Sequence, residues 1–129
     1  SFQIRQQNRQ SRDASSQWCV EQINAMRLLV MQDQEVAEMM LEGRRSMNDL
    51  SPLKKFQFLN YMDLFFATFW SQYQSIQNGT SDLTFAFLED TFATLGQSPG
   101  AVEAWRSALR DRYPEDFRLY IDQWMVEGN

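Results

Sequence analysis

The sequence predicts an all-α fold: a compact bundle of about five to six helices around an aromatic-rich central helix over residues 53–77. Helix-forming residues dominate, and the short alternating runs of β-branched residues that are typical of strands are absent. Eight of the eighteen aromatic residues fall between positions 53 and 76. A chain of 129 residues is long enough for one domain with a core of its own.

The periodicity of apolar residues predicts the central helix. Its apolar positions recur at spacings of three and four, which places them on one stripe of a helix. They are Leu59, Met62, Phe66, Phe69, Tyr73 and Ile76. Further apolar residues lie beside and behind this stripe, so we expect other helices to cover it on several sides. Ser51-Pro52 is a typical helix start, and Asn78-Gly79 is a typical end.

The N-terminal part predicts a long polar helix. Residues 1–17 are rich in Gln and Arg, and we expect this leader to continue, without packing, the helix that runs from Trp18 to about Met31. The inner face of that helix consists of Cys19, Ile23, Met26 and Val30. The predicted organisation is therefore a basic leader over 1–17 and a single helical domain over 18–129.

Cap residues, glycines and prolines delimit the other helices. The predicted limits are Asp33 and Gly43 for a second helix, Ser81 or Asp82 and Gly96 for a fourth, Ser98-Pro99 for the start of a fifth, and Pro114 to Val126 for the last. The predicted buried positions are Phe85, Leu88, Phe92 and Leu95 in the fourth helix, and Val102, Trp105 and Leu109 in the fifth.

The charge distribution is uneven. The net charge is −5, yet residues 1–12 contain Arg5, Arg9 and Arg12 and no acid, so the rest of the chain has a balance of −8. An acidic body repels a phosphate backbone, which argues against a nucleic-acid partner. The three arginines are the candidate lipid-facing residues, because each cation gains about 1 kcal/mol near an anionic lipid surface.

Several chemistries lack the residues that they need. The chain has no His, and Cys19 is its only cysteine, so the usual general base, a Cys-rich zinc site and an internal disulfide are excluded. No Gly-rich phosphate loop or nucleophile elbow is present. We therefore expect no enzymatic activity, no cofactor and no metal. The acidic trio Glu35, Glu38 and Glu42 is interpreted as a solvent-facing helix surface.

Asp63 is the most informative charged residue, because it lies in the most apolar helix of the chain. A partly buried carboxylate needs a partner, and Arg106, Arg110 or Arg118 could supply it. The favoured interpretation is a structural ion pair between helices. The alternative is a carboxylate that contacts a ligand.

Taken together, the segments resemble a broad group of small bacterial proteins with one N-terminal transmembrane helix and a soluble all-α domain of uncharacterised function. The resemblance rests on the basic leader, the LLVMQDQEVAEMML block, the aromatic central helix and the closing segment, SPGAVEAWRSALRDRYPEDFRLYID. The matching positions of that segment are Gly100, Trp105, Arg106, Tyr113, Pro114, Phe117, Arg118 and Tyr120. The resemblance implies a transmembrane segment before Ser1 and a domain on the cytoplasmic face of the bacterial inner membrane. It supplies no catalytic residues.

Two functional hypotheses follow. The first is a non-enzymatic, membrane-tethered helical domain that acts as a scaffold through a protein partner or through its own copies. The alternative is a small-molecule sensor or carrier that encloses an apolar ligand in its aromatic core, with Asp63 and an arginine as polar contacts.

Overall fold

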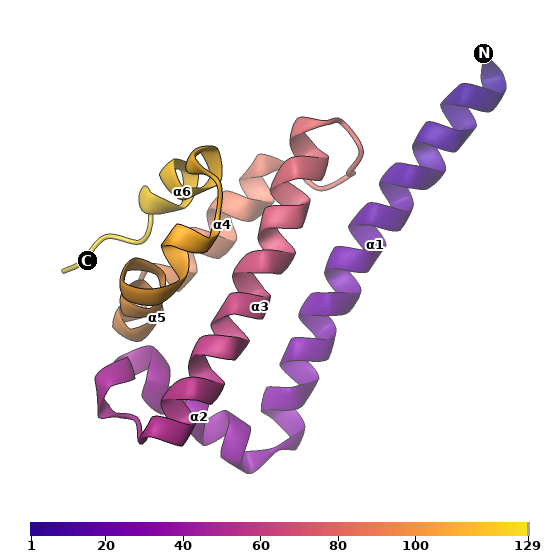
Figure 1. Ribbon diagram of the computed structural model, residues 1–129. Helices are drawn as coiled ribbons and strands as arrows, with labels where there is room; N and C mark the ends of the chain where they lie inside the picture. The colour runs from indigo at the N-terminus through magenta and orange to yellow at the C-terminus, as the bar shows by residue number, and fades with distance from the viewer. Residues whose placement is uncertain (129) are drawn as a thin grey trace.

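The computed structural model describes residues 1–128, and it confirms the all-α fold. The six α-helices are α1 (Phe2–Gln32), α2 (Gln34–Arg45), α3 (Pro52–Gln77), α4 (Phe85–Leu95), α5 (Pro99–Ala104) and α6 (Glu115–Asp122). The described residues form no strand. Helix α1 lies beside α3 and extends past the rest of the molecule at its N-terminal end, while α2 lies at the other end of α3 (Figure 1).

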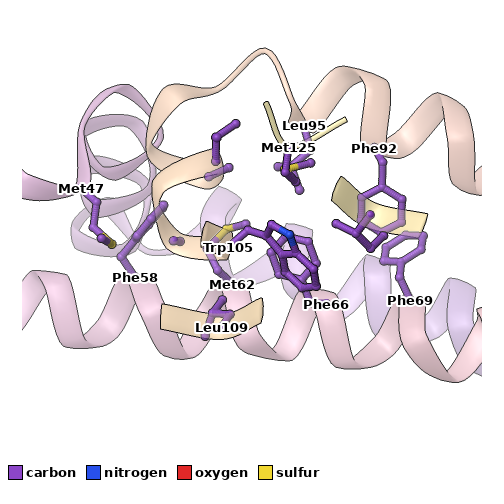
Figure 2. Packing of buried hydrophobic residues seen from close by; sticks show 14 of the residues in the cluster. Met47, Phe58, Met62, Phe66, Phe69, Phe92, Leu95, Trp105, Leu109 and Met125 are labelled. Carbon is purple, nitrogen blue, oxygen red and sulfur yellow. The ribbon is translucent and has the colours of Figure 1, made fainter. Parts of the chain in front are cut away.

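Helix α3 is the centre of the core, as predicted. Figure 2 shows Phe58, Met62, Phe66 and Phe69 of α3 pointing into the cluster, where Phe66 lies against Trp105. The ring centroids of Phe66 and Trp105 are 4.7 Å apart. The largest buried side chains come from α3, α4 and the C-terminal third of the chain. The core is therefore made largely by aromatic side chains that are distant in sequence.

The predicted starts of α2 and α3 are confirmed, and each has a side-chain cap. The carboxylate of Asp33 accepts hydrogen bonds from the backbone N–H groups of Glu35 and Val36, at 2.9 and 3.2 Å. Ser51 Oγ accepts from the N–H of Lys54 at 3.3 Å, and Pro52 follows at the first helical position. These caps satisfy donors that the first turn of a helix leaves unpaired.

The prediction that Gly43 ends the second helix is wrong. The helix continues to Arg45, and Gly43 is buried inside it. A Cβ at Gly43 would overlap the ring of Phe58, and a Cβ at Gly100 would overlap the carbonyl oxygen of Gly43 itself. Both glycines thus allow α2 to lie close to α3 and α5, so the physical role of Gly43 is helix contact rather than helix termination.

Two other predicted limits are also wrong. Helix α4 begins after Thr84, because Ser81 caps a preceding turn: its Oγ accepts from the N–H of Leu83 at 3.1 Å and donates to Gln72 Oε1 at 2.9 Å. Helix α6 ends at Asp122 rather than at Val126. The carbonyl oxygen of Met125 accepts instead from Arg106 Nε, at 2.6 Å.

The segment after α5 is a widened turn. Residues Trp105–Leu109 are π-helical (η2) and are followed by a 3₁₀ turn, Arg110–Arg112 (η3). Trp105 and Leu109 are buried, as predicted. Trp105 faces α6, where its indole N–H donates to Asp122 Oδ1 at 2.9 Å. The C-terminal third is thereby tied to the core by a polar contact as well as by packing.

Candidate interaction surface

The N-terminal part of α1 is the most exposed element of the fold. Residues 1–11 are all exposed, although they are helical from Phe2 onward. Packing begins farther along the helix, where Gln72 Nε2 donates to the carbonyl oxygen of Ser15 at 3.1 Å, and where Cys19 and Met26 are buried. An isolated helix of about eleven residues is only marginally stable in water. The first three turns, which we call the α1 projection (residues 1–11), therefore lack the contacts that stabilise the rest of the helix.

The arginines of the leader lie along one side of this helix. Arg5, Arg9 and Arg12 are spaced i, i+4 and i+7, and the buried Cys19 follows Arg12 after two further turns. The cations thus continue the side of α1 that faces the core. Arg12 Nε lies 3.7 Å from Asp82 Oδ1, while neither Arg5 nor Arg9 forms an ion pair with residues 1–128. Two cations remain available on the inner side of the α1 projection.

An acidic surface lies on α4 and α6. Glu89, Glu115 and Asp116 are exposed, and none of them forms an ion pair within the described part of the chain. The ring centroids of Tyr73 and Tyr120 are 4.8 Å apart. Burial is the main cause that raises the pKa of each phenol. The charge of Asp116 raises the pKa of Tyr73 further, and that of Glu89 raises the pKa of Tyr120. We refer to these three acids, with Leu119 (57 % exposed), as the α4/α6 acidic surface.

A third exposed feature is apolar. Leu53, Phe56 and Leu64 are spaced i, i+3 and i+11 on α3, which places them along its outer side, and each is about half exposed or more. Trp18 and Leu29 of α1 are also exposed. Large apolar side chains that remain in water on a helical surface are typical of interaction sites when they lie together.

The structure pairs Asp63 with residues that were not predicted. Arg112 Nη1 donates to Asp63 Oδ2 at 2.9 Å, and Tyr113 Oη donates to Oδ1 at 3.1 Å. The Asp63 side chain is 33 % exposed and that of Arg112 is 60 % exposed. Burial raises the pKa of the Tyr113 phenol, and the carboxylate of Asp63 raises it further. The arrangement is a partly exposed ion pair that joins α3 to the segment between η3 and α6.

The three arginines proposed as partners of Asp63 bind elsewhere. Arg110 donates to both carboxylate oxygens of Asp122, at 2.7–3.0 Å, and Arg106 donates to the carbonyl oxygen of Met125. Arg118 Nη1 lies 4.0 Å from Asp111. Helical spacing could not distinguish these arginines from Arg112, because the widened turn after Ala104 rotates the side chains that follow it.

We expect Asp63→Asn to lower the free energy of unfolding by about 1 kcal/mol, because exposed ion pairs contribute little and the amide oxygen can still accept from Tyr113. Chemical denaturation monitored by tryptophan fluorescence measures this change. Arg112→Ala is the matched control and should cost about the same, since it removes the other half of the pair. A loss of several kcal/mol in Asp63→Asn alone would show that the carboxylate has a further buried partner.

Sequence reasoning missed the α4/α6 acidic surface, because Glu89 and the Glu115-Asp116 pair are far apart in the chain and no local pattern relates them. It also missed a cleft that residues of α1, α2, α3 and α4 form beside Arg27 and Tyr61. The signal for the α1 projection was present, in the change from polar residues to an apolar stripe at Trp18.

Comparison with protein-family models, with curated proteins and with solved structures found no match. Within residues 1–128, no helix is both long enough and apolar enough to cross a membrane. In the two longest helices, α1 and α3, charged and amide side chains interrupt the runs of apolar residues. The prediction that the chain belongs to that group of bacterial proteins is therefore wrong, because no family model matches it and residues 1–128 form no such span. The predicted segment before Ser1 lies outside the described residues. The cytoplasmic location was drawn from that resemblance and stays a prediction.

Proposed function

We propose that this protein is a non-enzymatic helical interaction domain that pairs with a second copy of itself. In the pair, the α1 projection of each copy lies on the α4/α6 acidic surface of the other. The observation that carries the proposal is the α1 projection, a helical segment whose residues are all exposed and whose two arginines, Arg5 and Arg9, form no ion pair within residues 1–128.

Charge complementarity supports this choice of partner. Residues 1–12 carry three positive charges and no acid, whereas residues 13–129 have a balance of −8. Arg5 and Arg9 would meet Glu89 and Asp116, and Phe2 and Ile4, both exposed, would contribute apolar contact beside Leu119. Complementary charge of this kind selects and orients partners more than it adds affinity.

Native mass spectrometry and light scattering on the purified chain test the proposal. We expect a dimer at low salt that dissociates as ionic strength rises, because exposed charge pairs are screened within about 8 Å at 0.15 M salt. The double variant Arg5→Glu/Arg9→Glu should be monomeric. Mixing it with Glu89→Arg/Asp116→Arg should restore a dimer, now composed of one copy of each variant.

Leu64→Lys is the matched control, because it places a charge on the exposed apolar row of α3 and leaves the α1 projection unchanged. It should remain dimeric. A wild-type chain that is monomeric at tens of micromolar in low salt would contradict the proposal. So would a dimer that the arginine variants do not affect but Leu64→Lys dissociates, since that result assigns the interface to α3.

A further inference from the structure

A surface cleft is lined by residues of the four helices α1, α2, α3 and α4. It consists of three adjoining hollows of about 460, 360 and 190 Å³, and all three are lined by Arg27 and Tyr61. Ligand sites in proteins are typically clefts of roughly 300–1,000 Å³ with an apolar lining and a few placed polar groups. The cleft has the size of such a site.

The floor of the cleft is apolar and its position is fixed. Met40, Met62 and Phe65 line the largest hollow. Tyr61 forms a wall, and its hydroxyl donates to the carbonyl oxygen of Met26 at 3.0 Å, which joins α3 to α1 beneath the cleft. Burial raises the pKa of the Tyr61 phenol, and the charge of the nearby Arg44 offsets part of this rise. Flexible Met side chains beside an aromatic ring can adapt to an aliphatic chain.

The rim of the cleft bears two arginines. Arg27 of α1 and Arg44 of α2 are both exposed, and neither forms an ion pair with residues 1–128. Arg44 Nε donates to Ser98 Oγ at 3.2 Å, which leaves its remaining N–H groups available. The one acid that lines the cleft, Asp90 of α4, is not in contact with either guanidinium. Two guanidinium groups beside an apolar floor match a molecule with an anionic end and an apolar body.

We propose that this cleft binds a long-chain aliphatic carboxylate, with its carboxylate between Arg27 and Arg44 and its chain along Met40, Met62 and Phe65. The site is distinct from the one that the sequence suggested, since the residues that line the cleft do not include Asp63. The cleft shares α4 with the α4/α6 acidic surface, but its lining includes neither Glu89 nor any residue of α6 or of the α1 projection.

The test uses dodecanoate as the probe and the full chain labelled with ¹³C at the methionine methyl groups. We expect dodecanoate, below its micelle concentration, to shift the Met40 and Met62 methyl resonances in a saturable way. Dodecyltrimethylammonium has the same chain with the opposite charge, and it should bind at least about tenfold more weakly, which corresponds to the loss of about one charge-assisted contact. Equal affinity for the two probes, or no shift at Met40 and Met62, would overturn the proposal.

Three variants separate the polar and the apolar parts of the site. Arg27→Ala/Arg44→Ala should weaken dodecanoate binding about tenfold or more, whereas Arg45→Ala, at the neighbouring exposed position, should leave it unchanged. Asp90→Asn should strengthen binding about two- to threefold, because it removes the only negative charge that lines the cleft. Unchanged binding in the arginine double variant would place the ligand elsewhere.

A fourth variant tests the cleft without altering its charge. Thr91, which lines two of the three hollows, is half-buried, and Thr91→Phe should fill the space and abolish binding. Thermal unfolding confirms that the variant is folded, and native mass spectrometry should show the same oligomeric state as for the wild type. Retained binding in a folded Thr91→Phe protein would overturn the proposal, whatever the outcome for self-association.

Discussion

Replacement of Gly100 by alanine should lower the free energy of unfolding by about 3 kcal/mol, the upper range for forcing an extra methyl group into a packed interior. The added Cβ would overlap the carbonyl oxygen of Gly43, which is backbone and cannot rotate away. The direction of this change in stability is informative, because a Gly→Ala replacement inside a helix ordinarily stabilises a protein by about 0.4–1 kcal/mol. For a chain of this length, we expect the melting temperature to fall by roughly 10 °C.

Gly79→Ala is the matched control. Gly79 has a φ of 70°, but a Cβ at this position would have no neighbour within 4 Å. Its replacement should therefore cost only the backbone strain of a left-handed residue, about 1–2 kcal/mol. If Gly100→Ala proves as mild as this control or stabilises the protein, α2 and α5 must be able to move apart, and the close crossing is not essential to the fold.

Replacement of Asp122 by alanine should have the second large effect, a loss of about 2–4 kcal/mol. The carboxylate accepts from the buried indole N–H of Trp105 and from Arg110, and its removal leaves both donors without that partner. Asp111→Ala is the matched control, because Asp111 is 91 % exposed and lies 3.9 Å from Arg110; it should change stability by less than about 0.5 kcal/mol.

The Asp122 contribution should depend on pH. Hydrogen bonds from Arg110 chiefly, and from Trp105, hold the pKa of Asp122 below its ordinary value. A depressed folded-state pKa gives stability that is present above the unfolded-state pKa of about 3.9 and is lost as the pH falls through the folded-state pKa. The difference in stability between wild type and Asp122→Asn should therefore be constant near neutral pH and should shrink below about pH 4. A difference that grows on acidification would assign the stabilisation to another group.

The sequence by itself determined the fold class, the central helix and most of the buried positions. Apolar residues at spacings of three and four can share one side only in a helix, and Ser51-Pro52 and Asp33 mark helix starts through local hydrogen bonds. These are properties of a few neighbouring residues, so a sequence pattern is sufficient to identify them. Leu88, Phe92 and Trp105 are buried for this reason, as predicted.

Only the tertiary structure decided which distant groups meet. Gly43 was predicted to end a helix, because the sequence alone does not distinguish a glycine that ends a helix from one that allows close packing inside it. Asp63 was assigned to the wrong arginines, because the π-helical turn over Trp105–Leu109 changes the direction of every side chain after it. The cleft beside Arg27 and Arg44 depends on the relative positions of α1, α2, α3 and α4 around Tyr61. Each of these outcomes depends on distances between separate elements, which helical periodicity does not encode.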